Sequence, residues 1–202
     1  MSGQATPFQA SPKDRPAGPP ARTSRWLGAL AIAGGICFLA VAWIGATNPT
    51  FHGDLDSTIE YLNDAFGSAA LVLTIPGLIG LRGVQGAPRA AVETAVTGQL
   101  LIVSGVLAGL LLGQDPSWFP AVGIPGNLLW LIGTVRIARH TWKARVFPRW
   151  TAIALALTVP VGMVLGEFGG SALPGVLWIY LGWRLITLGR SESVHRLPQT
   201  RG

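Results

Sequence analysis

The sequence predicts an all-α fold, a polytopic transmembrane helical bundle of six spans with both termini in the cytoplasm. Half of the residues are hydrophobic, only 12% are charged, and the mean hydropathy is +0.46. Soluble domains carry about 25% charged residues, so this composition indicates that lipid is the solvent. Six long stretches contain no charged residue, and the basic residues gather in alternate segments between them.

The first three uncharged stretches are residues 26–53, 65–81 and 94–114. A hydrocarbon core about 30 Å thick needs about 20 helical residues, and about 17 is the lower limit. The first stretch is longer than one crossing requires, so the span takes its most apolar part. The other two are close to the length of one crossing. We therefore expect helices over residues 26–46, 64–82 and 92–113.

The last three uncharged stretches are residues 116–135, 150–166 and 168–183. The sixth stretch is short, and it reaches a full crossing at Leu188 if Arg184 extends its side chain to the membrane interface. We expect helices over residues 117–137, 149–166 and 170–188. Residues 136–149 then form a basic loop between the fourth and fifth spans.

Charge predicts the orientation. With the N-terminus in the cytoplasm, all 15 Lys and Arg residues fall in cytoplasmic segments or at cytoplasmic helix ends, as the positive-inside rule requires. Most of the nine acidic residues then fall outside: Asp54, Asp56, Glu60, Asp64, Asp115 and Glu167. The domain organisation follows: a disordered, Pro- and Gly-rich cytoplasmic tail at 1–25, a transmembrane domain at 26–188, and a short cytoplasmic tail at 189–202. The expected location is the plasma (inner) membrane.

The stretch FHGDLDSTIEYLNDAFG, residues 51–67, gathers four carboxylates and a histidine in the first outer segment. Ser57 and Glu60 have the spacing of a capping box, in which each side chain bonds a free amide at the start of a helix. Carboxylate and imidazole groups are also ligands for divalent cations. A helix cap in a solvated acidic loop is the favoured interpretation. A metal site is the alternative, with these candidate ligands: His52, Asp54, Asp56 and Glu60.

The spans lack the groups that most catalytic sites need. No Asp, Glu, Lys, Arg or His lies in the middle of a predicted span, although such residues are the usual functional pointers within a membrane. All three histidines are expected in loops or tails, so neither a haem nor any other cofactor is predicted. The net charge of +6 does not indicate nucleic-acid binding, because the basic residues alternate with long uncharged stretches. We expect a non-enzymatic protein.

Two amides and a row of glycines mark the third and fourth spans. Gln99 and Asn127 are expected either to join helices by hydrogen bonds or to line a polar cavity. Gly105, Gly109 and Gly113 follow one another at four-residue steps, which is typical of close helix packing. We favour packing within the chain over packing against a second copy.

The second and fifth spans share a short motif. LVLTIPG, residues 71–77, resembles LALTVPV, residues 155–161, and each half of the chain has three spans, so matching halves would be inverted in the membrane. A proline within a helix leaves the carbonyl four residues earlier without its amide. Proline-broken helices at equivalent positions of inverted repeats indicate a transporter site. The candidate residues for a solute path or for helix packing are Thr74, Pro76, Gln99, Asn127, Thr158 and Pro160.

The stretch FPRWTAIALAL, residues 147–157, resembles a pattern of small six-helix bacterial integral membrane proteins of unknown function. In that pattern, Pro-Arg-Trp after a basic loop opens the penultimate helix. The resemblance covers the C-terminal half of the chain and implies a multipass membrane protein without a defined activity.

These observations lead to two expectations for function. The first is a non-enzymatic accessory or interaction subunit, whose partners are the lipid bilayer and either another membrane protein or a second copy of the chain. The alternative is a transporter or channel for a small solute, built on a 3+3 inverted repeat.

Overall fold

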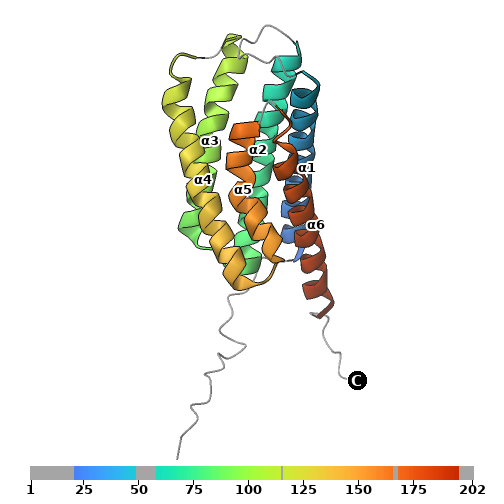
Figure 1. Cartoon of the computed structure of the whole chain (residues 1–202). Coiled ribbons are helices and arrows are strands. Elements are labelled where there is room, and N and C mark those ends of the chain that lie inside the picture. The colour runs from blue at the N-terminus through green and yellow to red at the C-terminus, as the bar shows by residue number, and fades with distance from the viewer. Residues whose placement is uncertain (1–20, 49–57, 115, 166–167, 196–202) are drawn as a thin grey trace, which may run out of the picture.

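The computed structural model describes residues 21–48, 58–114, 116–165 and 168–195. In these ranges the chain forms six α-helices and no strand (Figure 1). The helices are α1 (Ala21–Thr47), α2 (Thr58–Gln85), α3 (Arg89–Leu112), α4 (Phe119–Ala144), α5 (Arg149–Leu165) and α6 (Ala172–His195).

Five of the helices are long and apolar enough to cross a membrane: α1, α2, α3, α4 and α6. The remaining helix, α5, is apolar but has only 17 residues. The prediction of a helical membrane protein is therefore confirmed at this level. Each of the six predicted spans falls on one helix.

Three predicted boundaries are wrong, because hydropathy detects the apolar part of a helix and not its polar ends. The predicted tail at 1–25 overlaps α1, which begins at Ala21, and α6 continues to His195, through all of the described part of the tail at 189–202. The basic loop predicted at 136–149 is mostly helical, since α4 continues to Ala144. His140 thus lies within a helix and not in a loop.

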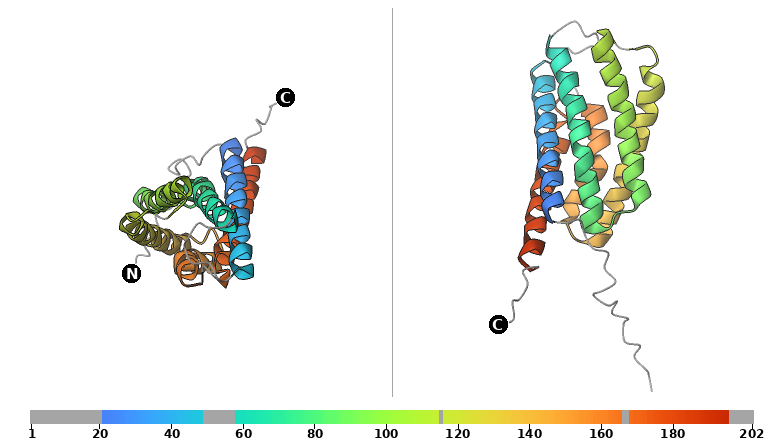
Figure 2. Two further views of the ribbon diagram at one scale, coloured as in Figure 1. Left: turned by 90° about the horizontal axis from the view of Figure 1, so that it is seen from above. Right: turned by 180° about the vertical axis from the view of Figure 1, so that it is seen from behind.

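The six helices form a ring in chain order. Each helix packs against the next one along the chain, and α6 closes the ring against α1 (Figure 2). Neighbouring helices run in opposite directions, so the ring has two ends. The termini end is where α1 begins and α6 ends, and the distal end is where α1 ends and α2 begins.

The most extensive helix contact, between α1 and α6, is held together by glycines. A Cβ atom placed on Gly28 would lie 2.6 Å from the carbonyl oxygen of Gly182, and one placed on Gly35 would lie 2.7 Å from that of Gly175. The two backbones therefore meet at two points, seven residues apart on each helix. Such close approach is possible only because these positions lack a side chain.

The next most extensive contact, between α3 and α4, repeats this arrangement. A Cβ on Gly98 would meet the Gly126 carbonyl oxygen at 2.5 Å and would also collide with the backbone of Trp130. A Cβ on Gly126 would lie 2.9 Å from the Ile102 side chain, and one on Gly133 would collide with Ala95.

The two contacts match position by position, with glycine at the same places. In the α1–α6 contact, Gly28, Ile32 and Gly35 face Ile186, Gly182 and Ile179, respectively. In the α4–α3 contact, Gly126, Trp130 and Gly133 face Ile102, Gly98 and Ala95. If the residue numbers of α1 are shifted so that Gly28 falls on Gly126, the contact residues of α1 fall on those of α4. A second shift, which places Gly98 on Gly182, does the same for α3 and α6. The second shift also carries the α2 motif at 71–77 onto the α5 motif at 155–161.

The prolines of these motifs do not break their helices. Pro76 lies within α2 and Pro160 within α5, and both helices continue past the proline. The Thr74 hydroxyl donates to the Leu71 carbonyl at 2.9 Å, and the Thr158 hydroxyl donates to the Ala154 carbonyl at 2.9 Å. The expectation of broken helices is therefore wrong. The two threonine hydroxyls thus bond carbonyls other than those of Val72 and Ala156, which lie four residues before the prolines.

Candidate functional site: a cavity between the six helices

A cavity of about 320 Å³ lies inside the distal half of the ring. It receives side chains from all six helices, with Pro174 from α6, and also from Ser171 just before α6. In Figure 1, α5 and α6 stop short of the level that α2 and α3 reach at this end. The volume lies at the lower end of the ~300–1,000 Å³ typical of ligand pockets.

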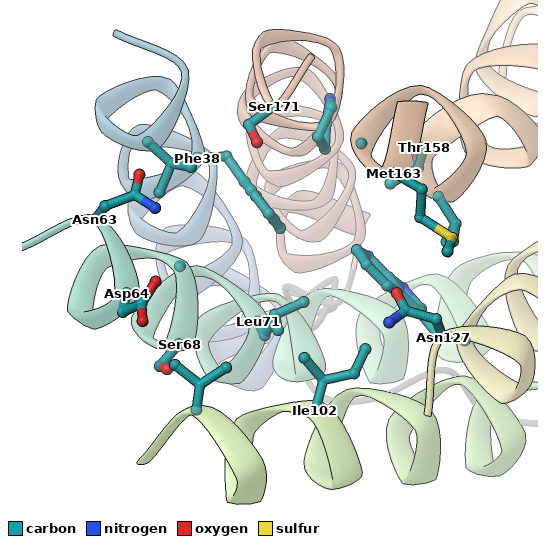
Figure 3. A pocket seen from close by; sticks show the side chains of 17 residues that line it. Phe38, Asn63, Asp64, Ser68, Leu71, Ile102, Asn127, Thr158, Met163 and Ser171 are labelled. Carbon is teal, nitrogen blue, oxygen red and sulfur yellow. The ribbon is translucent and has the colours of Figure 1, made fainter. Parts of the chain in front are cut away.

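The cavity has an apolar floor and polar groups around it. Figure 3 shows Leu71 and Ile102 facing the same space as Phe38, with Asp64 and Ser68 on one side and Asn127 and Met163 on the other. The polar lining residues are Asn63, Asp64, Ser68, Asn127, Thr158 and Ser171. A mostly apolar space with a few polar groups is the usual form of a small-molecule site.

The two predicted amides have different roles. Asn127 lines the cavity, and its Nδ2 donates only within its own helix, to the Gly123 carbonyl at 2.9 Å. Gln99 is fully buried, and its Nε2 donates to the Thr74 hydroxyl of α2 at 3.1 Å. One amide is therefore part of a polar cavity and the other joins two helices.

Thr158 lines the cavity at the middle of α5, whereas its counterpart Thr74 in α2 is buried in the contact with Gln99. Neither Pro76 nor Pro160 is a lining residue. Of the candidate solute-path residues, Asn127 and Thr158 are thus in the cavity, and Thr74 and Gln99 lie in the packing beside it.

Apolar packing closes the termini half of the ring. Leu78, Leu81, Ile137, Leu155 and Leu185 are almost completely buried there. A polar cluster lies beyond them: His140 Nε2 donates to the Gln85 carbonyl at 2.9 Å, and the Thr141 hydroxyl donates to Gln85 Oε1 at 3.0 Å.

Most of the candidate metal ligands lie outside the described residues. This applies to His52, Asp54 and Asp56, and also to Ser57 of the predicted capping box. Glu60 lies in the first turn of α2. Among the residues that the structure describes, no three His, Cys, Asp or Glu side chains are close enough together to hold a metal ion.

The glycine row on α3 has a mixed outcome. Gly105 packs within the chain, since a Cβ there would collide with the ring of Phe119 in α4. Gly113 instead ends α3 in a left-handed conformation with φ of 69°, which glycine adopts readily. Internal packing is therefore confirmed for Gly105, and Gly113 acts as a helix cap.

Several lining residues were not predicted: Phe38, Ser68, Trp130 and Met163. The spacing of Asp64, Ser68 and Leu71 on one face of α2 is the sequence signal that could have identified this wall.

Comparisons with protein-family models, curated proteins and solved structures found no match for this chain.

Proposed function

We propose that this protein is a six-span membrane protein with both termini in the cytoplasm, and that it binds a small solute in the cavity and carries it across the plasma membrane. In this proposal the termini end faces the cytoplasm and the cavity faces outward. The described Lys and Arg residues support this orientation, because all of them occupy positions in the termini half of the ring. In this proposal α5 also crosses the membrane, because its 17 residues are about the smallest number that can span the hydrocarbon core.

The observation that carries the proposal is the cavity in the distal half of the ring. The helices α1 to α3 and α4 to α6 share glycine and Thr-Pro positions, and only one half of the ring holds this cavity. Under the numbering shifts, the cavity residues Ser68, Leu71 and Gly162 correspond to Ala152, Leu155 and Leu78. Ala152 is 3% exposed, Leu155 1% and Leu78 0%, so these three counterparts are closely packed. Transporters built on inverted repeats alternate between two such arrangements, with one half open and the other closed.

The repeated glycine contacts suggest which parts move together. The pairs α1–α6 and α3–α4 have backbones in direct contact, which makes each pair a stiff unit. By contrast, α5 packs less extensively against α6 than α1 does. We propose that the two glycine-packed pairs rock against each other, with α2 and α5 between them.

The expectation of an accessory or interaction subunit remains a second candidate. Exposed apolar side chains occur on every helix, as lipid contact requires, so no single face stands out as a partner surface. They include Ile36 on α1, Ile79 on α2, Leu107 on α3, Ile132 on α4, Ile153 on α5 and Val176 on α6. The cavity distinguishes the candidates, because a bundle that acts only through its outer faces does not need one.

A matched pair of cysteine variants tests whether the cavity holds water and opens outward. In a Cys37→Ala background, Gly162→Cys places a thiol in the cavity, where an added Cβ meets nothing within 4 Å. Val164→Cys places one two residues away on a position that is 76% exposed and faces lipid in this proposal. A membrane-impermeant maleimide added outside cells should label Gly162→Cys and leave Val164→Cys unlabelled. Equal labelling of the two variants would contradict the proposal.

A further inference from the structure

We propose that the solute is a small organic cation, with Asp64 as its counter-ion and an apolar, aromatic pocket around its body. The inference rests on the proposed function, since it assigns a chemical class to the solute of that cavity. Four observations support it: the charge of the lining, the charge of the distal end, the composition of the remaining wall, and two buried polar atoms without a partner.

Asp64 is the one ionisable residue among the described residues that line the cavity. It projects from α2 at the same end as Glu60, one turn away. The described Lys, Arg and His residues all lie in the termini half. A low-dielectric cleft with charge of one sign concentrates ligands of the opposite sign and repels those of the same sign. The cavity therefore favours cations over anions.

The wall indicates an organic cation and not a metal ion. Multivalent metal ions require several oxygen, nitrogen or sulfur ligands, and no group of three His, Cys, Asp or Glu occurs among the described residues. The lining instead contains the aromatic rings of Phe38 and Trp130, which are 6% and 8% exposed. Aromatic rings attract ammonium groups and also pack against apolar groups.

Two buried polar atoms in the wall have no hydrogen-bond partner among the described residues. They are Ser68 Oγ, one turn from Asp64 on α2, and Trp130 Nε1 on α4. Buried polar groups almost always have a partner, so unpaired ones in a cavity wall require an explanation. A polar group on the solute, or a water bound with it, would supply the missing partner.

The test uses three ligands with one carbon skeleton and different charge: 3-phenylpropylamine, 3-phenyl-1-propanol and 3-phenylpropanoate. Their binding to the purified full-length protein in lipid nanodiscs is measured by calorimetry at neutral pH and low salt. We expect the amine to bind about tenfold more tightly than the alcohol, and the carboxylate to bind most weakly, because one partly desolvated charge pair contributes on this scale. Salt should weaken the amine selectively. An amine that binds no more tightly than the alcohol would overturn the inference.

Two carboxylate variants locate the charge that is responsible. Asp64→Asn should lower the affinity for the amine to that for the alcohol. Glu60→Gln removes the same charge one turn away, outside the cavity lining, and should change the affinity less than Asp64→Asn does, since the interaction between charges weakens with distance. Equal effects of the two variants would overturn the role of Asp64. If Asp64→Asn does not fold, Ser171→Lys adds a positive charge to the lining and should reverse the order of amine and carboxylate.

The outcomes also separate this inference from the proposed function. If the alcohol binds as well as the amine, the cation assignment fails and the cavity still holds a solute. If none of the three ligands binds, the cation assignment fails as well. The cysteine labelling of the cavity then decides separately whether the proposed function stands.

Discussion

The glycine contact between α1 and α6 predicts a specific loss of stability when one methyl group is added. In Gly182→Ala, the new Cβ would lie 2.5 Å from the Gly28 carbonyl oxygen and 2.7 Å from the Ile32 side chain. An ordinary contact needs at least 3.4 Å, so the helices must separate by about 0.9 Å at this point. The Gly28 oxygen belongs to the backbone and cannot move aside by a change of rotamer.

The expected loss is about 2 kcal/mol. Added methyl groups in packed cores cost roughly 1–3 kcal/mol, and a separation of 0.5–1 Å removes about a quarter to a half of the dispersion energy of each contact along the pair. Each kcal/mol lowers the midpoint of thermal unfolding by about 2–4 °C for a chain of this length. We therefore expect Gly182→Ala to lower the midpoint by about 4–8 °C.

Cys37 provides the assay, because this free thiol on α1 is partly buried. A thiol-reactive fluorophore should label it as the detergent-solubilised protein unfolds on heating. Gly162→Ala is the matched control: its Cβ would have no atom within 4 Å, and alanine favours a helix over glycine by about 1 kcal/mol. Its midpoint should be unchanged or slightly raised. The reasoning is refuted if Gly182→Ala unfolds at the same temperature as Gly162→Ala, or higher.

Two further predictions concern the buried amide and the prolines. Gln99→Leu should lower stability by about 1 kcal/mol in the same thermal assay, because it removes a buried bond to Thr74 between helices; Asn127→Leu, which loses only a bond within its helix, should lower it less. Pro76→Ala and Pro160→Ala together should raise the unfolding temperature and reduce uptake of the solute into proteoliposomes at least about tenfold, since restored backbone bonds stiffen α2 and α5. Unchanged uptake by the double variant would show that transport does not depend on these prolines.

The sequence was sufficient to predict the helices because the signal for them is local. An uncharged stretch of about 20 residues indicates a helix in lipid whatever surrounds it. The errors lie at polar helix ends, as in α4, where basic residues continue the helix past the apolar stretch to Ala144. Hydropathy carries no information about such an extension.

The site could be predicted only in part, because it depends on which residues meet across helices. Thr74 and Thr158 occupy matching positions in the two motifs, yet one is buried against Gln99 and the other lines the cavity. The difference arises from the unequal packing of the two halves, which no single stretch of sequence encodes. The glycines of these contacts can be read from the sequence, but the sequence does not say which helix each of them faces. Gly28 and Gly182, which meet between α1 and α6, are an example.

The central claim is that the two halves exchange roles, and one cysteine pair tests it most directly. In the Cys37→Ala background, Ala152→Cys replaces the counterpart of the cavity residue Ser68, and Ala154→Cys replaces the counterpart of Ala70, which does not line the cavity. Both alanines are buried in this structure. The account predicts that an impermeant maleimide added to the cytoplasmic side of inverted vesicles slowly labels Ala152→Cys and not Ala154→Cys. Absence of labelling at both positions, or equal labelling at both, would contradict the exchange.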